Sequence, residues 1–333
     1  MAAMRIGLCV RGFTQIRQVL EELLPHDEIV ECNSRDILER AADCVVLVPI
    51  VTPIPAEVLR YRSLQLIQQY GVGLDVVDIP AATQAGVLVA NVPSVGTGNA
   101  ESVAELAVAH MLMLSRNMPL ALQRFREQRF SSPLGECLWR STVVILGYGG
   151  IGEEIARRLA GFGVRIIAIS RHGPSGSRAR DPAVRVDLHV AQTQMAAVLG
   201  EADFLVVAAP ASPENIGLVD ATVLAQLRPG TFIVNIARGP VIDYDALLAA
   251  LQEGRLAGAG LDVFWQEPFD PNDPLLRENV IATPHIGGAT ARSLRGIGAA
   301  VARNIEALRH DELPACCVNP HAKQVRDQDK LAR

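Results

Sequence analysis

Three side chains that could perform acid–base and anion-binding chemistry follow successive apolar runs in the last third of the chain. Arg238 comes directly after "TFIVNIA", Glu267 lies three residues after "GAGLDVF", and His285 ends "VIATPH". An arginine can grip a carboxylate through two parallel N–H donors, and a histidine can transfer a proton near neutral pH. A glutamate beside the imidazole would fix its tautomer and favour its protonated form. These residue types suit the reduction of a 2-keto acid.

Each of the three would have its own part in that reaction. Arg238 would hold the substrate carboxylate, His285 would give a proton to the developing alkoxide, and Glu267 would hydrogen-bond the other imidazole nitrogen. In the oxidative direction His285 would act as the base. Only His285, among seven histidines, stands at a strand end with neighbouring glycines, Gly287 and Gly288, which let a ligand approach closely. The six other histidines lack that setting: His26, His110, His172, His189, His310 and His321.

A glycine-rich turn provides a site for a dinucleotide. After the apolar run "TVVIL", glycines stand in the spacing G-x-G-x-x-G and open a helical stretch. In such motifs the first glycine permits a sharp turn, the second lets the backbone approach a pyrophosphate, and the third allows close helix–strand packing. The free N–H groups of the helix N-terminus then face the anion. The candidate cofactor-binding residues of this turn are Gly147, Gly149, Gly150, Ile151 and Gly152.

The residues after the next strand indicate which dinucleotide binds. An Asp or Glu about twenty residues after the motif normally holds the ribose 2′-hydroxyl of NAD. Here the run "RIIAI" ends in Ser170, Arg171 and His172, and the loop continues with Ser175, Ser177, Arg178 and Arg180. No acid repels a 2′-phosphate, and Arg171 can pair with one. We therefore expect NADP(H) to be preferred, with NAD(H) use possible if Arg171 only faces solvent.

Two series of strand and helix patterns predict the fold. Five short apolar runs in the first hundred residues, from "RIGLCV" to "VLVANV", alternate with helical spacing. A second series contains six runs, "TVVILG", "RIIAIS", "DFLVVAAP", "TFIVNIA", "GAGLDVF" and "VIATPHI". Such alternation predicts α/β architecture, with two doubly wound parallel-sheet domains. We also expect an all-round apolar helix over Asn99–Ser115, a helix near Ala289–Leu308 and a mobile charged tail.

The composition excludes several classes of protein. With 333 residues, 49% of them hydrophobic, the chain is expected to be globular, and its net charge of −5 argues against nucleic acid or anionic membrane as a partner. Six scattered cysteines contain no C-x-x-C pair, so we expect neither a metal site nor a disulfide framework. The N-terminal apolar stretch is too short for a signal peptide. A cytoplasmic protein is the expectation.

The motifs together resemble those of the D-isomer-specific 2-hydroxyacid dehydrogenase family. They occur in order over nearly the whole chain as "GVGLDVVDIPAATQAGVLVANVP", "SVAELAVAHML", "LGYGGIG", "NIARGPVID", "GLDVFWQEP" and "TPHIGGAT". The resemblance implies a Rossmann nucleotide domain, residues 99–289, inserted into a flavodoxin-like substrate domain of residues 1–98 and 290–333. It also implies a homodimer formed through the nucleotide domains.

The resemblance assigns further residues to the site. It makes Arg238, Glu267 and His285 the catalytic residues, and it implies that the backbone at Val72 and Gly73 binds the substrate carboxylate. Asp262 would contact the nicotinamide amide. The remaining candidate cofactor-binding residues would line the cofactor: Ala209, Pro210, Ile236, Ala237, Gly287 and Gly288.

The missing acid at Ser170 is similar to what NADPH-using glyoxylate and hydroxypyruvate reductases show within the family. We therefore expect reduction of a small 2-keto acid to be the working direction. Two alternatives stay open. One is a cofactor-sensing binding protein without turnover, resembling transcriptional corepressors of the same fold. The other is a dehydrogenase for an oxyanion such as phosphite, which shares the three catalytic residues and differs in substrate alone.

Overall fold

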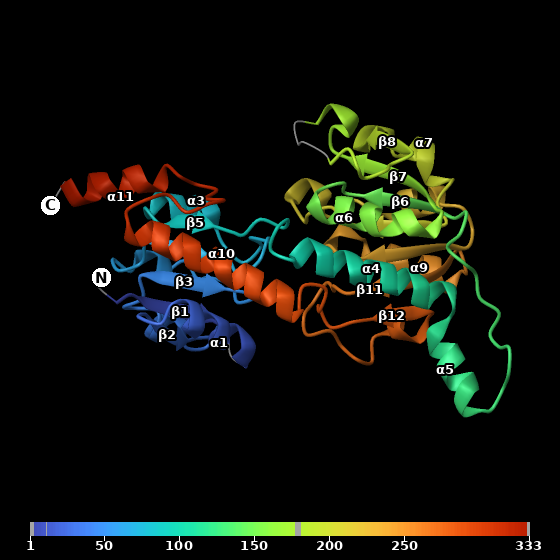
Figure 1. Cartoon of the computed structure of the whole chain (residues 1–333), viewed down its shortest axis with the longest axis horizontal. Coiled ribbons are helices and arrows are strands. Elements are labelled where there is room, and N and C mark those ends of the chain that lie inside the picture. The colour runs from blue at the N-terminus through green and yellow to red at the C-terminus, as the bar shows by residue number, and fades with distance from the viewer. Residues whose placement is uncertain (1–2, 11, 177–180, 332–333) are drawn as a thin grey trace. The chain divides into compact units, whose positions relative to one another are not determined.

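The computed structural model describes residues 3–10, 12–176 and 181–331. The chain divides into two compact units, and the path crosses between them twice (Figure 1). The first unit combines Met1–Asn99 with Ala291–Arg333, and the second unit is Ala100–Thr290. Within the described residues, no helix is both long enough and apolar enough to cross a membrane.

The first unit contains a five-stranded sheet in which all neighbouring strands are parallel. Its strand order, β2-β1-β3-β4-β5, is the order of flavodoxin-like folds. The strands are β1 (Arg5–Cys9), β2 (Glu28–Glu31), β3 (Val46–Pro49), β4 (Leu66–Gln68) and β5 (Leu88–Ala90). The helices of this unit are α1 (Thr14–Leu23), α2 (Ile37–Arg40), α3 (Ile79–Gln84), α10 (Ala291–Arg309) and α11 (Ala322–Leu331).

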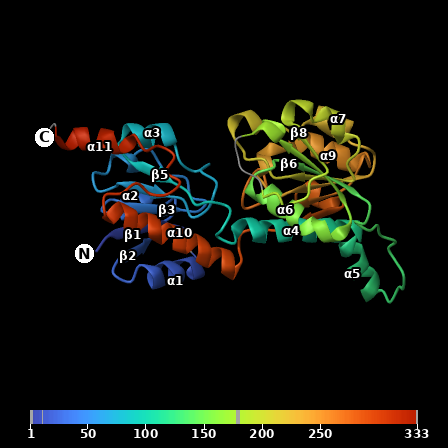
Figure 2. The same cartoon turned by 45° about the horizontal axis from the view of Figure 1, so that its top comes forward.

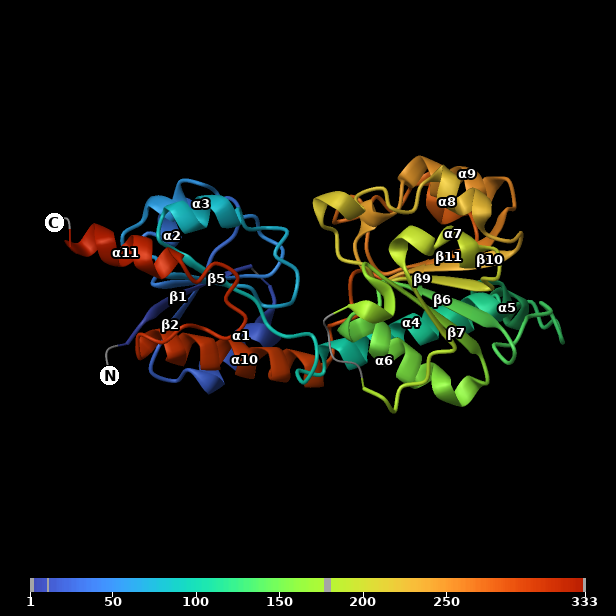
Figure 3. The ribbon, with the colours of Figure 1, turned by 90° about the horizontal axis from the view of Figure 1, so that it is seen from above.

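Helices cover both faces of this sheet, as a fully parallel sheet requires. Figure 2 shows α1 and α10 beside each other along one face, and Figure 3 shows α2 and α3 on the opposite face. The strand residues alternate between the two sides: Leu8 and Val48 belong to the core beneath α1 and α10, whereas Leu47 and Val89 belong to the core on the other side. The strands β3 and β5 are therefore apolar at every position.

The second unit contains a seven-stranded sheet, also parallel throughout. Its order is β12-β11-β10-β9-β6-β7-β8, which is the Rossmann arrangement with one added strand, β12. The strands are β6 (Thr142–Leu146), β7 (Arg165–Ser170), β8 (Leu188–Ala191), β9 (Phe204–Val207), β10 (Thr231–Asn235), β11 (Leu256–Leu261) and β12 (Val280–Ala282). The helices are α4 (Asn99–Ser115), α5 (Met118–Arg126), α6 (Gly150–Leu159), α7 (Ala196–Leu199), α8 (Ala221–Gln226) and α9 (Tyr244–Gln252).

The expected architecture of two parallel-sheet α/β domains is thus confirmed, and so is the helix Asn99–Ser115. Figure 3 shows α4 and α6 on one face of the second sheet and α8 and α9 on the other. Ala104 and Met111 of α4 are fully buried there. Because α4 contacts its surroundings on most sides, its apolar residues are not confined to a single stripe.

Two expectations about elements were wrong. The second series has seven strands, because β8 follows "VRVD" at the edge of the sheet, is only partly buried and has no apolar run to mark it. The charged tail contains the helix α11 and is held in place: Ala322 is fully buried, and the backbone of Arg326 packs against Gly86. A short apolar contact at its start is enough to fix a helix that is otherwise polar.

Candidate active site

His285 and Glu267 form a hydrogen-bonded pair in the second unit. His285 follows β12, and Glu267 lies in the loop after β11, so both stand beyond the carboxyl ends of neighbouring strands. The Nδ1 atom of His285 is 2.8 Å from Oε2 of Glu267. Both side chains are about one-third exposed, at 35% and 32%. The pair leaves Nε2 of His285 as the nitrogen available for proton transfer.

The environment of Glu267 favours its charged form. Burial raises the pKa of this carboxyl, but the hydrogen bond and charge of His285, the Phe264 N–H and the charge of Arg238 outweigh it, so the pKa lies below its ordinary value. The Phe264 N–H donates to Oε1 at 3.1 Å while His285 occupies Oε2. Glu267 is therefore a fixed anion that holds the imidazole from one side.

Arg238 stands beyond the end of β10, the strand adjacent to β11. Its backbone is held by Asn235, whose fully buried amide donates to the Arg238 carbonyl at 3.0 Å. Its guanidinium is partly buried, and Nη1 donates to the Ala237 carbonyl at 2.8 Å. Because β10 and β11 are neighbouring parallel strands, the loops that carry Arg238 and Glu267 leave the same edge of the sheet, and the charge of Arg238 helps to lower the pKa of Glu267. The three residue types are thus gathered at one edge of the sheet.

The backbone at His285 has a left-handed conformation, with φ +53°, which is uncommon for residues other than glycine. The segment that follows is held by Asp262, which is 2% exposed. Its Oδ1 accepts from the Ile286 N–H at 2.8 Å, and its Oδ2 accepts from the Gly287 N–H at 2.8 Å. A Cβ on Gly287 would lie 2.9 Å from Oδ2, so this close approach needs a glycine. Asp262 therefore fixes the turn that carries His285.

The glycine motif has the expected strand–turn–helix setting. Helix α6 begins at Gly150 with Gly149 as its N-cap, directly after β6. At Gly147 φ is +102°, and a Cβ would lie 2.3 Å from the Ala209 nitrogen. At Gly149 an added Cβ would meet no atom within 4 Å, so the space in front of this backbone is open. The first N–H groups of α6, which include those of Ile151 and Gly152, have no acceptor within the helix. The open space and the N–H donors at the start of α6 fit a pyrophosphate.

Ser170 is the last residue of β7, in the position where an acid would hold the ribose. Its Oγ lies 2.8 Å from Nε2 of His189 on β8. The guanidinium of Arg171 pairs with the carboxylate of Glu214, and both side chains are more than half exposed. His172 is exposed at the start of the following turn. Of the loop residues expected to add donors, Ser177, Arg178 and Arg180 lie outside the described residues.

The remaining candidate residues occupy loops of both units. Ala209 is buried and Pro210 exposed after β9, while Ile236 and Ala237 continue from β10 toward Arg238. Gly288 is partly buried. Val72 and Gly73 lie in the loop after β4 of the first unit, where the Val72 carbonyl accepts from the Asn91 amide at 2.6 Å.

Sequence reasoning missed four residues that contact the candidate site. Glu214 pairs with Arg171 and His189 contacts Ser170, from 43 and 19 positions away along the chain. The Thr283 hydroxyl donates to Asp262 Oδ1 at 2.6 Å, and His110 of α4 lies behind Thr283. Thr283 could have been suspected because it stands in the "TPHIGG" run, but no local pattern connects His110 or Glu214 to the site.

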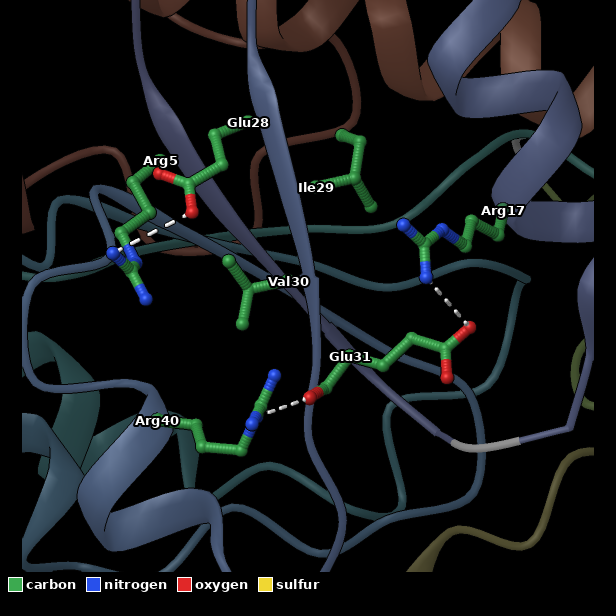
Figure 4. A pocket seen from close by; sticks show the side chains of 7 residues that line it. All are labelled: Arg5, Arg17, Glu28, Ile29, Val30, Glu31 and Arg40. Atoms are coloured by element: carbon green, nitrogen blue, oxygen red, sulfur yellow. Dashed lines mark hydrogen bonds and ion pairs between the residues drawn. The ribbon is translucent and has the colours of Figure 1, made fainter.

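A separate pocket lies in the first unit, along the edge strand β2 (Figure 4). Its charged side chains face one another: Arg5 is 3.5 Å from Glu28, and Arg17 is 3.8 Å from Glu31. The Nε of Arg40 donates to the Glu31 carbonyl at 2.6 Å. None of the candidate site residues lines this pocket. Among the residues that the structure describes, no group of three or more His, Cys, Asp or Glu side chains could hold a metal ion.

Comparison with known proteins agrees with this geometry. The family model described as D-isomer specific 2-hydroxyacid dehydrogenase, NAD binding domain, matches residues 108–287. The chain is 35% identical to a glyoxylate reductase of Korarchaeum cryptofilum and covers 95% of both proteins. It is 34% identical to a glyoxylate reductase of Thermococcus onnurineus, over 95% of this chain and 94% of the other.

A solved structure is similar over the same extent. The NADPH-dependent glyoxylate/hydroxypyruvate reductase of Sinorhizobium meliloti, in complex with NADP and malonate, superimposes with a TM-score of 0.80 and 30% identity, over 96% of this chain and 97% of that one. The match includes both parallel-sheet units. The chain therefore belongs to the D-isomer-specific 2-hydroxyacid dehydrogenase family, whose members are oxidoreductases that act on CH–OH donors with a nicotinamide cofactor.

Proposed function

We propose that the protein reduces a short 2-keto acid to the D-2-hydroxy acid, with NADPH as the preferred cofactor. The observation that carries this proposal is the 2.8 Å pair of His285 and Glu267 beside Arg238 at one edge of the second sheet. A proton donor, a group that orients it and a carboxylate-binding cation are what the reaction needs besides hydride. When bound, the nicotinamide cofactor supplies that hydride.

Each residue then has one task. Arg238 binds the substrate carboxylate and orients the keto group. His285 donates its Nε2 proton to the carbonyl oxygen as that oxygen gains negative charge, and it takes the proton back in the reverse direction. Glu267 holds Nδ1 of His285 and stabilises the imidazolium. The balanced reaction consumes one keto acid, one hydride and one proton and yields one hydroxy acid.

The glycine turn and the end of β7 would hold the cofactor. Gly149, Gly150 and Ile151 would bind the pyrophosphate through the backbone, with open space in front of Gly149 to receive it. Ser170 and Arg171 would hold the 2′-phosphate. Because Arg171 and Glu214 are more than half exposed, their ion pair is weak and can open when a phosphate binds. These features support NADPH over NADH.

The substrate proposal draws on the relatives and on the first unit. Two glyoxylate reductases and a glyoxylate/hydroxypyruvate reductase resemble this chain over at least 94% of their length. We infer that the first unit is the substrate domain and that the backbone at Val72 and Gly73 binds the substrate carboxylate. The stretch "VGLD" in that loop and the separate stretch "VPIVTPIP" from the end of β3 onward consist mostly of small or apolar residues, which supports a short keto acid such as glyoxylate or hydroxypyruvate.

We further propose that the protein is a homodimer formed through the second unit. Figure 1 shows α5 and the loop after it extending away from the sheet of this unit. Leu122 and Phe125 of α5 are 53% and 82% exposed, and Phe130 and Leu134 of the loop are each 95% exposed. Large apolar side chains exposed along one short stretch of chain are typical of an association surface. A second copy would cover them.

Initial rates test the proposed reaction. NADPH and NADH oxidation would be followed with glyoxylate, hydroxypyruvate, pyruvate and phenylpyruvate. We expect turnover that is fastest with a short keto acid and at least about tenfold higher in kcat/KM with NADPH, a difference of about 1.4 kcal/mol. Cofactor binding without turnover of any keto acid would favour a sensor. Turnover of phosphite with NADP⁺ in the absence of keto-acid reduction would favour an oxyanion dehydrogenase.

A further inference from the structure

A buried histidine on α4 continues the hydrogen-bond network behind His285. His110 has no solvent exposure, and its Nε2 is 3.1 Å from the Thr283 hydroxyl. Gly260 of β11 packs against it, and a Cβ there would lie 2.9 Å from the His110 Cβ. All of these residues belong to the second unit. The imidazole is therefore enclosed between α4 and the strand that leads to Asp262.

The direction of the hydrogen bonds follows from the number of protons. The Thr283 hydroxyl has one proton, and it is donated to Asp262 Oδ1 at 2.6 Å. The same hydroxyl must then accept from His110, so Nε2 of His110 carries a proton. Burial lowers the pKa of His110 and outweighs the opposing charge of Asp262, which favours the neutral imidazole.

The other imidazole nitrogen gives the reason to look for a function. Nδ1 of His110 is buried and has no hydrogen-bond partner among the residues that the structure describes. An unsatisfied buried polar atom costs free energy, and an aliphatic side chain of similar size would avoid that cost. Packing alone therefore does not account for a histidine here. The imidazole contributes one hydrogen-bond donor, the Nε2–H group, which is directed at the Thr283 hydroxyl.

The chain of hydrogen bonds ends at the two amides that follow His285. Asp262 accepts from Thr283, from the Ile286 N–H and from the Gly287 N–H. His110 fixes the Thr283 hydroxyl, and Thr283 in turn fixes the carboxylate that holds the left-handed turn at His285. We propose that His110 and Thr283 are positioning residues, which act through Asp262 to hold His285 in place for proton transfer. This inference rests on the proposed function.

Variants of His110 and Thr283 test the inference. His110→Leu fills the space without a donor, and His110→Gln keeps an N–H donor. We expect His110→Leu to lower kcat about tenfold or more, to leave the KM for the keto acid within about threefold, and to keep the Tm at or above that of the wild type. His110→Gln should retain kcat within about threefold. Thr283→Val should act like His110→Leu, and the double variant should be no worse than Thr283→Val alone.

Amide hydrogen exchange gives a readout that does not depend on turnover. In the apoprotein, His110→Leu should speed exchange at the Ile286 and Gly287 amides about tenfold and leave the amides of β6 unchanged. Ser115→Ala is the matched control, because Ser115 is a buried polar residue of the same helix whose hydroxyl donates to Leu112 outside this network. It should change neither kcat nor the exchange of these two amides.

The outcomes separate the two proposals. If the wild type turns over a keto acid but His110→Leu has wild-type kcat and wild-type exchange at both amides, the positioning role is wrong. If the exchange changes as expected but no keto acid is turned over, the positioning network stands and the proposed reaction fails. A loss of kcat in His110→Gln and Thr283→Ser equal to that in the two apolar variants would indicate a packing effect and would also overturn the inference.

Discussion

The carboxylate of Glu214 lies against the guanidinium that we propose for the 2′-phosphate of NADPH. In the absence of cofactor the pair neutralises Arg171, and in its presence Glu214 would repel the phosphate. Both side chains are more than half exposed, so water and salt screen these interactions and each contributes little. The preference for NADPH is therefore set by a small difference between the attraction of the phosphate by Arg171 and its repulsion by Glu214.

Glu214→Gln should strengthen that preference. Without the carboxylate, Arg171 is free to pair with the phosphate, and kcat/KM for NADPH should rise about two- to fivefold, as expected for one exposed charge. The value for NADH, which has no 2′-phosphate, should stay within about twofold. Steady-state kinetics with both cofactors measures the effect, and Arg171→Ala is the companion variant that should lower kcat/KM for NADPH alone. Equal changes for both cofactors in these variants would contradict the assignment.

Glu267 gives a prediction about pH. Its pKa in the folded protein lies below the ordinary value of 4.5, because the interactions with His285, Phe264 and Arg238 outweigh burial. A depressed pKa stabilises the fold above pH 4.5, and this contribution is lost as the pH falls through the folded value. The Tm of the wild type should therefore exceed that of Glu267→Gln near pH 6, and the gap should close toward pH 3. A gap that stays constant over this range would show that the charge of Glu267 does not stabilise the fold.

The sequence predicted the pairing of Glu267 with His285 because strand ends in a parallel sheet share one edge. Glu267 and His285 each follow an apolar run, so their meeting at 2.8 Å needs only the strand order. His110 could not be found in this way. It stands in the middle of a buried helix, and its contact with Thr283 depends on how α4 packs against β11, which no local spacing encodes.

At the scale of elements, the turn between β6 and α6 contains two glycines with different requirements. Gly147 is needed for the fold, since φ is +102° and a Cβ would lie 2.3 Å from the Ala209 nitrogen and 2.5 Å from the Ala208 carbonyl carbon. Gly149 is not needed for the fold, because nothing lies within 4 Å of an added Cβ. The lack of a side chain at Gly149 is required only if a ligand occupies that space.

The two alanine variants should therefore differ. Gly147→Ala should lower the free energy of unfolding by about 2–4 kcal/mol through backbone strain and overpacking. Gly149→Ala should leave it within about 0.5 kcal/mol and weaken NADPH binding at least about tenfold. Denaturant unfolding and fluorescence titration measure the two quantities. A Gly149→Ala variant that binds NADPH as the wild type does would contradict the proposed pyrophosphate site.

The elements that the sequence did not reveal are those that lie at edges. Strand β8 has a neighbour on one side only, so its residues are partly exposed and their pattern is weak. Helix α11 is mostly polar and is fixed by Ala322 and by the close approach of Arg326 to Gly86. Central elements such as β6 and α4 were predicted correctly because burial on both sides requires continuous apolar sequence.

At the scale of the whole molecule, the exposed arm of α5 and its loop gives a test of assembly. If a second copy covers Phe130 and Leu134, each 95% exposed, then a charge there should break the dimer. Sedimentation at micromolar concentration should show a dimer for the wild type and a monomer for Leu134→Asp. Leu38→Asp is the control, because Leu38 is 48% exposed on α2 of the first unit. A monomeric wild type, or a dimer in Leu134→Asp, would contradict an interface through this arm.

The most direct test of the proposed chemistry compares the wild type with His285→Ala in glyoxylate reduction by NADPH, with the Kd for NADPH measured by fluorescence in both. Loss of a general acid costs about 10²–10⁴ in rate. We expect kcat/KM to fall about 1,000-fold while the Kd for NADPH stays within about threefold. A His285→Ala variant that reduces glyoxylate at close to the wild-type rate would show that His285 is not the proton donor.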